Sequence, residues 1–292
     1  MSAVRRPARG AVTVSEALEL AAQRLGPEAG RAEARFLVAG VLGLAAGELA
    51  LKGTGALAPA ERGALARAIR RRRAGEPLAY VLGTAAFREI QLAVDPRVLI
   101  PRPETERLVE AVMGLPVGAD APVLEVGTGS GAIALSLLHE RRFRSVVATD
   151  ISARALEVAR SNAAALGLQR RVDLRLGDTY DPVGPGERYE LVVSNPPYIA
   201  EAERAALPPE VREFEPPAGL YAGDGLAMIR RLVRGAPAVL VPGGWLALEF
   251  GATQATAVRA ELLDAGLREV RILPDLAGRD RIALGRRAGT VP

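Results

Sequence analysis

The fold of this chain is decided by one stretch, Val123-Leu124-Glu125-Val126-Gly127-Thr128-Gly129-Ser130-Gly131. Its first four residues predict a buried strand, and an apolar helical pattern through Ile133 and Leu137 follows the glycines. Glycines between a strand and a helix permit positive φ angles and let the backbone approach a ligand closely. Together with Ala132 the stretch also fits the relaxed dinucleotide fingerprint, so it predicts a nucleotide-like cofactor without selecting one. The predicted cofactor-binding residues of this loop are Gly127, Thr128, Gly129 and Gly131.

Strand and helix patterns alternate from this stretch to the end of the chain. Further strands are predicted at residues 145–149, 172–176, 189–194, 245–250, 268–273 and 281–284, and helices at 153–166, 225–240 and 253–265. Such alternation predicts an α/β class with a mainly parallel sheet covered on both faces. Ligands bind these sheets at the carboxyl ends of the strands, so the residues just after each strand are candidates for a site.

Acidic residues stand at three of these strand ends. Asp150, with Ile151 beside it, would accept hydrogen bonds from ribose hydroxyls under either cofactor. Glu125 could meet the cationic amino-acid end of S-adenosylmethionine, and Asp178, in Gly177-Asp178-Thr179, could accept from an adenine amino group. Their joint placement favours S-adenosylmethionine, with S-adenosylhomocysteine as the product, over NAD. For each acid alone, a helix cap or a surface charge is an equally good interpretation.

The strand at 189–194 ends in Asn195-Pro196-Pro197-Tyr198. Two prolines fix φ at about −65° and remove two backbone donors, so the Pro196 carbonyl keeps one direction without a competing N–H. Asn195 adds a neutral acceptor, and Tyr198 adds a flat aromatic wall. Two acceptors aimed at one NH2 group orient its nitrogen toward an electrophilic methyl group. We predict Asn195, Pro196, Pro197 and Tyr198 as catalytic, with Asn195 also at the cofactor; the alternative is a simple proline-rich turn.

The first part of the chain is predicted to be helical. A capped amphipathic helix runs from about Ser15 to Gly26-Pro27, and the apolar face of a second helix is formed by Phe36, Leu37, Val41 and Leu42. A third begins near Pro59 and ends in the arginines at 70–73, where cations suit the negative end of the helix dipole. We interpret this arginine run as a solvated helix end rather than a phosphate-binding surface.

A change of pattern separates this helical part from the sheet. Residues 87–94 and 98–100 are predicted strands, joined by a turn at Asp95-Pro96. We therefore predict three parts: a helical substrate-docking domain at residues 1–76, a β-hairpin linker at 77–101 and a cofactor-binding domain at 102–292.

Composition excludes several kinds of chemistry. The chain has 292 residues, no cysteine and a single histidine, His139, which excludes thiolate sites and multi-histidine metal sites. The net charge of +4 is compatible with a nucleic-acid-rich partner but does not identify one. The longest uncharged apolar run, Phe36 to Gly47, is too short to span a bilayer. We expect a cytoplasmic protein without a metal.

The chain resembles the release-factor glutamine methyltransferases over nearly its whole length. Besides the glycine loop and the tetrapeptide, the motifs that carry the resemblance are Gly75-Glu76-Pro77-Leu78-Ala79-Tyr80-Val81-Leu82-Gly83, Ile100-Pro101-Arg102-Pro103-Glu104-Thr105-Glu106, Phe214-Glu215-Pro216 with Gly223-Asp224-Gly225-Leu226, and Leu248-Glu249-Phe250-Gly251. The tetrapeptide also occurs in adenine amino-methyltransferases, whereas the Pro-Arg-Pro-Glu-Thr-Glu segment is much more particular to this family. One departure is Gly40, which stands where a histidine is expected.

The resemblance implies a seven-stranded Rossmann-like S-adenosylmethionine-dependent methyltransferase domain with an antiparallel last strand, preceded by a small helical domain and a β-hairpin linker. It implies methylation of the side-chain amide nitrogen (N5) of the glutamine in the Gly-Gly-Gln motif of class-one peptide-chain release factors, which tunes translation termination. We expect a monomer with these factors as protein partners, no membrane and no direct nucleic-acid substrate.

Three alternatives differ from this interpretation. The nearest is an adenine or guanine amino-methyltransferase acting on nucleic acid, since an amide and a base amino group pose the same geometric problem. Against it, aromatic residues make up only 4% of the chain, few for stacking a flipped base. An NAD-binding oxidoreductase is distinguished by the cofactor that binds. A non-catalytic scaffold is disfavoured by the intact tetrapeptide.

Overall fold

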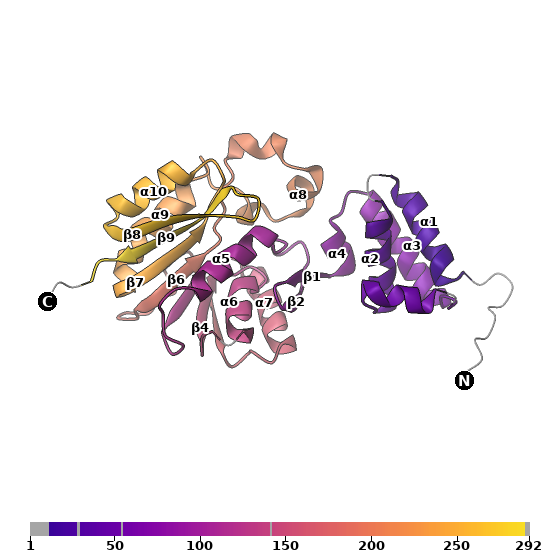
Figure 1. Cartoon of the computed structure of the whole chain (residues 1–292), viewed down its shortest axis with the longest axis horizontal. Coiled ribbons are helices and arrows are strands. Elements are labelled where there is room, and N and C mark those ends of the chain that lie inside the picture. Colours follow the sequence, from indigo (N-terminus) through magenta and orange to yellow (C-terminus); the bar gives the residue numbers. More distant parts are fainter. Residues whose placement is uncertain (1–11, 28–29, 54, 141, 290–292) are drawn as a thin grey trace. The chain divides into compact units, whose positions relative to one another are not determined.

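The computed structural model describes residues 12–27, 30–53, 55–140 and 142–289. Its contacts divide the chain into two compact units, one up to Gly83 and one from Thr84 onward (Figure 1). Among the described residues, no helix combines the length and the apolar character needed to cross a membrane.

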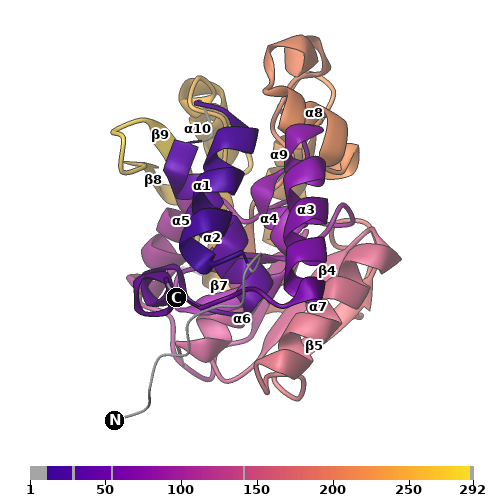
Figure 2. The same cartoon turned by 90° about the vertical axis from the view of Figure 1, so that its right-hand side faces the viewer.

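The first unit is built from helices. They are α1 (Val14–Leu25), α2 (Gly30–Leu42), the 3-10 helix η1 (Ala46–Lys52), α3 (Pro59–Arg73) and α4 (Leu78–Leu82), and Figure 2 shows α1, α2 and α3 packed together. The cap of α1 is Thr13, whose hydroxyl accepts from the Glu16 backbone N–H while the Glu16 carboxylate accepts from the Thr13 N–H. Ser15 is not the cap: its hydroxyl donates to the Gly53 carbonyl at 3.0 Å.

The inner face of α2 is the predicted one except at Phe36. Leu37 is fully buried, and Val41 and Leu42 pack against the same core, whereas Phe36 is 51% exposed and Val38 is buried instead. Gly40 lies so near α4 that a Cβ there would come within 2.5 Å of Leu82 Cδ2. A glycine at this position therefore lets α2 and α4 approach closely.

Two members of the arginine run tie the helices of the first unit together. Arg71 donates to the Glu76 carboxylate at 2.7 Å and to the Tyr80 carbonyl at 2.9 Å. Arg72 donates to Glu33 of α2, also at 2.7 Å. Arg70, Arg71 and Arg73 are exposed, as a solvated helix end requires, and only Arg72, whose side chain is 18% exposed, departs from this interpretation.

The hairpin lies earlier in the chain than predicted. It pairs β1 (Thr84–Phe87) with β2 (Ile90–Ala93), and both strands belong to the second unit. A turn does form at Asp95-Pro96, where the Val98 N–H donates to the Asp95 carbonyl at 3.1 Å, but it does not join two strands, and the predicted strand at 98–100 is wrong.

Long-range contacts explain why the hairpin turn was missed. Arg88 adopts a φ of 49°, a left-handed conformation that usually selects glycine or asparagine. Its backbone N–H donates to Glu106 at 2.9 Å, and its guanidinium donates to Glu140 at 2.5 Å. Carboxylates far along the chain stabilise this turn, so the sequence at the turn contains no glycine or asparagine from which it could be predicted.

The second unit is built on a seven-stranded sheet. Its strands are β3 (Val123–Val126), β4 (Val146–Asp150), β5 (Val172–Leu176), β6 (Tyr189–Ser194), β7 (Leu240–Glu249), β8 (Leu267–Pro274) and β9 (Asp280–Arg287). Their order is β5-β4-β3-β6-β7-β9-β8, with β3 to β7 parallel and β9 antiparallel to both of its neighbours. The predicted α/β class, the mainly parallel sheet and the antiparallel last strand are confirmed.

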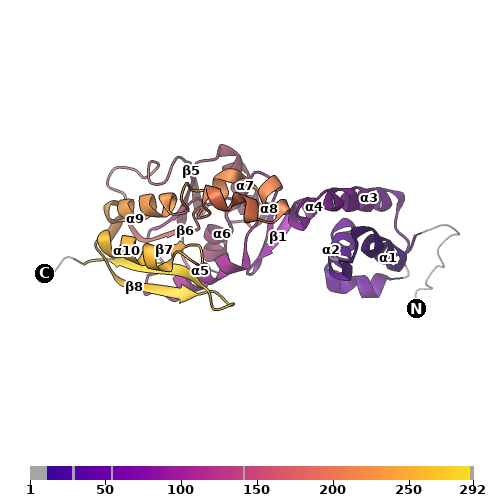
Figure 3. The same ribbon diagram turned by 90° about the horizontal axis from the view of Figure 1, so that it is seen from above.

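The second unit also contains helices, several of which pack against the sheet. They are α5 (Pro103–Met113), α6 (Ala132–His139), α7 (Ala153–Ala165), α8 (Pro209–Phe214), α9 (Ala227–Val239) and α10 (Ala255–Asp264), with short 3-10 turns η2 (Glu201–Ala206) and η3 (Pro217–Gly219). Figure 3 shows α9 and α10 side by side next to β7. Leu124 and Val126 share a buried cluster with Ile229 of α9. Because strand side chains alternate, Glu125 faces the opposite side, where the Ala134 N–H of α6 donates to it.

The strand order reverses between β3 and β6. The chain adds β4 and β5 on one side of β3, and it adds β6 and β7 on the other side. In open parallel sheets, such a switch point leaves a crevice at the carboxyl ends of the two central strands, where ligands bind. The glycine loop follows β3 and the tetrapeptide follows β6, so the topology brings these two motifs together.

Candidate active site

A cavity, here called the cofactor cavity, opens at this switch point. Its walls include most residues predicted for the cofactor, namely Glu125, Gly127, Thr128, Gly129, Asp150, Ile151, Asp178, Thr179 and Asn195. Pro196 and Pro197 line it as well, whereas Gly131 and Tyr198 do not. Gly131 instead precedes α6 with a φ of 87°, and a Cβ there would lie 2.8 Å from Leu135 Cδ1.

The glycine loop leaves room for a ligand. Gly127 and Gly129 have φ angles of 77° and 55°, and a Cβ built on either would meet no other atom within 4 Å. These positions therefore form a cradle that any side chain would fill. Ile151 is 62% exposed although it is a large apolar residue, so its side chain suits an apolar ring in the cavity.

Glu125 supplies a buried carboxylate at the end of β3. It is only 1% exposed, and its Oε2 accepts from the Thr128 hydroxyl at 2.7 Å and from the Ala134 N–H at 3.1 Å. Burial raises the pKa of Glu125 to about 7, against the lowering effect of these two hydrogen bonds. A cationic group in the cavity would favour the ionised form, so this wall suits the amino-acid end of S-adenosylmethionine.

Asp150 organises the loop as well as facing the cavity. One carboxylate oxygen accepts from the Gly129 N–H at 2.8 Å, and the other accepts from the Ser152 N–H at 2.9 Å. Burial raises the pKa of Asp150, and the two backbone hydrogen bonds oppose this effect. Each oxygen keeps a further lone pair, so the geometry fits a carboxylate that also accepts from ribose hydroxyls.

Asp178 has a partner that the sequence did not indicate. Arg231 of α9 donates to its Oδ2 at 2.8 Å in an ion pair whose side chains are both partly exposed. Thr179 next to it has a φ of 45° and lies in the turn that follows β5. A ligand at Asp178 would share this carboxylate with Arg231.

The tetrapeptide is held at both ends by residues that sequence reasoning did not select. Asn195 Nδ2 donates to the Thr105 hydroxyl of α5 at 2.9 Å. The Tyr198 hydroxyl donates to Glu249 Oε1, at the end of β7, at 3.0 Å. Both partners stand inside motifs quoted for the family resemblance, which is the one signal that marks them in the sequence.

A second cavity, here called the acceptor cavity, adjoins the cofactor cavity at the tetrapeptide. Its walls are mainly apolar, with Leu99, Ile199 and Leu220 among them, and Tyr198 lines it. Asn195 and Pro196 line both cavities. The two acceptors predicted for an NH2 group thus stand where a cofactor space and an acceptor space meet.

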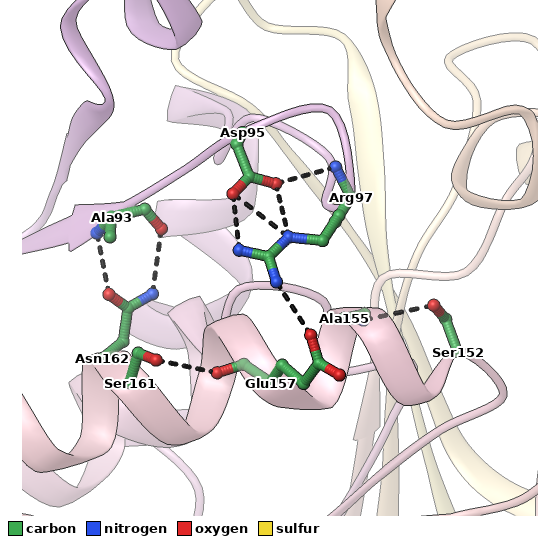
Figure 4. Close-up of polar contacts among 8 residues, drawn as sticks. All are labelled: Ala93, Asp95, Arg97, Ser152, Ala155, Glu157, Ser161 and Asn162. Atoms are coloured by element: carbon green, nitrogen blue, oxygen red, sulfur yellow. Dashed lines mark hydrogen bonds and ion pairs between the residues drawn. The ribbon is translucent and has the colours of Figure 1, made fainter.

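The segment that leads from the hairpin to α5 is anchored on α7 (Figure 4). The Asn162 amide brackets Ala93, accepting from its N–H at 2.7 Å and donating to its carbonyl at 3.0 Å. Arg97 donates to Asp95 at 2.6 Å and to Glu157 at 2.9 Å. Because Arg97 also lines the cofactor cavity, these contacts fix one of its walls.

The Pro-Arg-Pro-Glu-Thr-Glu segment forms ion pairs at the site. Arg102, which lines the acceptor cavity, pairs with the buried Glu215. Glu215 also accepts from the Ile100 N–H at 3.2 Å. Glu104 pairs with Arg279 at 3.3 Å. Among the described residues, no cluster of three or more His, Asp or Glu side chains could hold a metal ion.

A sheet with this strand order and a cavity at the β3–β6 switch point is the fold of the Rossmann-like methyltransferases. The catalytic domain of hMettl16, solved in complex with a MAT2A 3'UTR hairpin, shares this fold at a TM-score of 0.56. The match covers 80% of this chain and 83% of that one, at 17% identity. Residues 105–207 match the family model of the methyltransferase small domain, and residues 16–83 match the PrmC N-terminal domain.

Curated relatives identify the family. The release factor glutamine methyltransferase of Cereibacter sphaeroides is 44% identical over 276 residues, which are 93% of this chain and 98% of that protein. The protein of the same name from Bordetella pertussis is 46% identical over 257 residues, 87% of this chain and 94% of that protein. The chain belongs to the family of release factor glutamine methyltransferases.

Proposed function

We propose that the chain transfers a methyl group from S-adenosylmethionine to the side-chain amide nitrogen (N5) of the glutamine in the Gly-Gly-Gln motif of class-one release factors, and so tunes translation termination. The names of its relatives support the reaction and the class of substrate. The single observation that carries the proposal is that Asn195 and Pro196 line both the cofactor cavity and the acceptor cavity. A substrate side chain in the acceptor cavity would therefore meet the cofactor beside these two residues.

The cofactor supplies an electrophilic methyl group on a sulfonium centre. The glycine cradle with Thr128, the buried Glu125 carboxylate, Asp150 and Asp178 would hold it at the ends of three adjacent strands. Ile151 would pack against its base. These residues fit a molecule with a cationic amino-acid end, a ribose and an adenine.

The residues at the end of β6 orient the acceptor. A glutamine amide nitrogen is a poor nucleophile because its lone pair is delocalised into the carbonyl. Asn195 Oδ1 and the Pro196 carbonyl would accept its two hydrogens, fix the plane of the amide and stabilise the positive charge that develops on nitrogen. Most of the acceleration would come from this alignment, because positioning removes entropy from the barrier. Tyr198 would pack against the glutamine side chain in the acceptor cavity.

The alternative, an amino-methyltransferase acting on adenine or guanine of nucleic acid, is not favoured. The relatives that match this chain over most of its length carry the name of glutamine methyltransferases. The N-terminal residues 16–83 match the PrmC N-terminal domain. Neither observation is explained by a nucleic-acid substrate.

The division of labour between the two units is part of the proposal. The lining of both cavities comes from the second unit, so one chain carries the whole reacting centre and a monomer suffices. The helical first unit would dock the protein substrate. Release factors act in the cytoplasm, which is where we place the chain.

Labelled S-adenosylmethionine tests this function. The purified chain is incubated with a class-one release factor and, in parallel, with a variant whose Gly-Gly-Gln glutamine is replaced by alanine. Label on the wild-type factor alone supports the proposal. Label on neither factor, with cofactor binding established by calorimetry, would contradict it and direct the search to nucleic-acid substrates.

A further inference from the structure

The orientation of the Asn195 amide decides whether the tetrapeptide can accept a hydrogen bond. A side-chain amide is nearly symmetric in shape, so its oxygen and nitrogen can exchange places unless neighbouring groups select one orientation. Here Asn195 Nδ2 donates to Thr105 Oγ1 at 2.9 Å, which leaves Oδ1 as the acceptor. In the flipped amide, Nδ2 would replace Oδ1 and could not accept from an incoming NH2 group.

The orientation of the Asn195 amide depends on which acceptor takes the hydrogen bond from the Thr105 hydroxyl. A hydroxyl that accepts from Asn195 can donate its single hydrogen to another acceptor. Glu249 is fully buried, and the Thr105 hydroxyl stabilises its charged form. Glu249 Oε1 already accepts from Tyr198, while the buried Oε2 has no hydrogen-bond partner among the described residues and is the acceptor open to the Thr105 hydrogen. An ionised carboxylate can only accept hydrogen bonds. The Thr105 hydroxyl must then donate to Glu249, which leaves its oxygen to accept from Asn195 Nδ2.

We propose that Glu249 is a positioning residue that acts through Thr105 to keep Asn195 Oδ1, rather than Nδ2, available to the acceptor nitrogen. Glu249 lines neither cavity and so does not touch the reacting groups. It also holds the hydroxyl of Tyr198, so both ends of the tetrapeptide depend on one carboxylate. This inference rests on the proposed function and specifies how its central residue is held.

The surroundings of Glu249 make its effect depend on pH. Burial raises the pKa of Glu249 to about 7. The hydroxyls of Thr105 and Tyr198 and the positive charge of Arg281 on β9 lower this pKa, whereas the negative charge of Glu104 on α5 raises it. Once protonated, Glu249 can donate to Thr105 and no longer imposes the direction. The turnover number kcat is therefore expected to fall as the pH is lowered through this range.

Paired substitutions test the inference. Thr105→Val keeps the shape of the side chain but removes the relay, and Thr105→Ser keeps the hydroxyl. Glu249→Gln keeps the shape of the carboxylate but can donate. We expect Thr105→Val and Glu249→Gln each to lower kcat by roughly 10–100-fold, the effect of a lost hydrogen bond to a charged group, with KM and cofactor affinity nearly unchanged. Thr105→Ser should retain most of the activity.

Two further readouts separate positioning from general structural damage. The fall of kcat at low pH should disappear in Glu249→Gln. The side-chain amide resonances of Asn195, assigned in the NMR spectrum by comparison with Asn195→Asp, should shift in Thr105→Val and not in Thr105→Ser. An active wild-type chain whose Thr105→Val variant turns over at the wild-type rate would overturn the inference. A wild-type chain that labels no release factor would instead overturn the proposed function.

Discussion

The ends of β3 and β7 each carry a buried glutamate, and the two make an instructive pair. Glu125 is 1% exposed and Glu249 is 0% exposed. In both, burial raises the pKa to about 7. Yet Glu125 lines the cofactor cavity, whereas Glu249 lines neither cavity. The same side chain, equally buried, can therefore serve as a ligand-binding wall at one strand end and as a hidden support at another.

The difference lies in the partners that donate to each carboxylate. Thr128 and the backbone of Ala134 donate to Glu125, and both belong to the loop and helix that follow its own strand. Tyr198, which donates to Glu249, belongs to the tetrapeptide proposed to hold the acceptor. Changes at Glu125 should therefore appear in cofactor binding, and changes at Glu249 in turnover.

The largest effect is expected at Asn195, at the end of β6, the strand between β3 and β7. Asn195→Ala removes the proposed acceptor for the substrate amide and should lower kcat by roughly 10²–10³, as the loss of one transition-state hydrogen bond does elsewhere. The affinity for S-adenosylmethionine, measured by calorimetry, should remain within a few-fold of the wild-type value. Unchanged turnover in this variant would contradict the proposed mechanism.

The comparison itself is tested by the matched pair Glu125→Gln and Glu249→Gln. Glu125→Gln removes the carboxylate proposed to face the cationic end of the cofactor, and it should weaken cofactor binding by roughly 10–100-fold, as expected for a charged hydrogen bond. Glu249→Gln should leave the dissociation constant almost unchanged. Equal losses of affinity in the two variants would mean that the two glutamates do not have separate roles.

The sequence predicts one half of this comparison better than the other. The strand Val123–Val126, its glycines and the acids at strand ends are local patterns, because a parallel sheet places its ligand-binding residues at fixed positions after each strand. Glu249 was missed as a functional residue because its role depends on Thr105, 144 residues away in a different element, and on Tyr198. No local pattern reports such a contact.

The hairpin illustrates the same limit for the fold. Alternation placed a strand at 87–94, but the chain reverses at Arg88-Glu89, where Glu106 and Glu140 hold an arginine in a left-handed conformation. Local turn chemistry predicts the turn that does form at Asp95-Pro96, but that turn leads toward α5 and not into a second strand. There the aspartate binds Arg97 next to the cofactor cavity.

Both buried glutamates should also be visible in the stability of the chain. Their folded-state pKa values are raised from 4.5 to about 7, so between these values the folded chain keeps protons that the unfolded chain has released. The free energy of unfolding should therefore fall as the pH rises through this window. Urea unfolding at pH 5 and pH 8 should show that Glu249→Gln gains stability relative to the wild type at the higher pH. Glu19→Gln, at an exposed site on α1, is the control; an identical change in both variants would contradict the burial argument.

The smallest effect is expected at the open rim of the cofactor cavity, where the carboxylate is neither buried nor isolated. Asp178 shares its Oδ2 with Arg231 in a partly exposed ion pair, and such pairs contribute about 0.2–1 kcal/mol to stability. Asp178→Ala should weaken cofactor binding by roughly 3–10-fold, the value of one ordinary hydrogen bond. Arg231→Ala is the matched control, because it removes the ion pair but keeps the carboxylate that is proposed to accept from the adenine amino group; its cofactor affinity should equal or exceed that of the wild type. If Arg231→Ala loses as much affinity as Asp178→Ala, the ion pair rather than the carboxylate alone determines the affinity at this rim, and Asp178 does not bind the cofactor in the way proposed for Glu125.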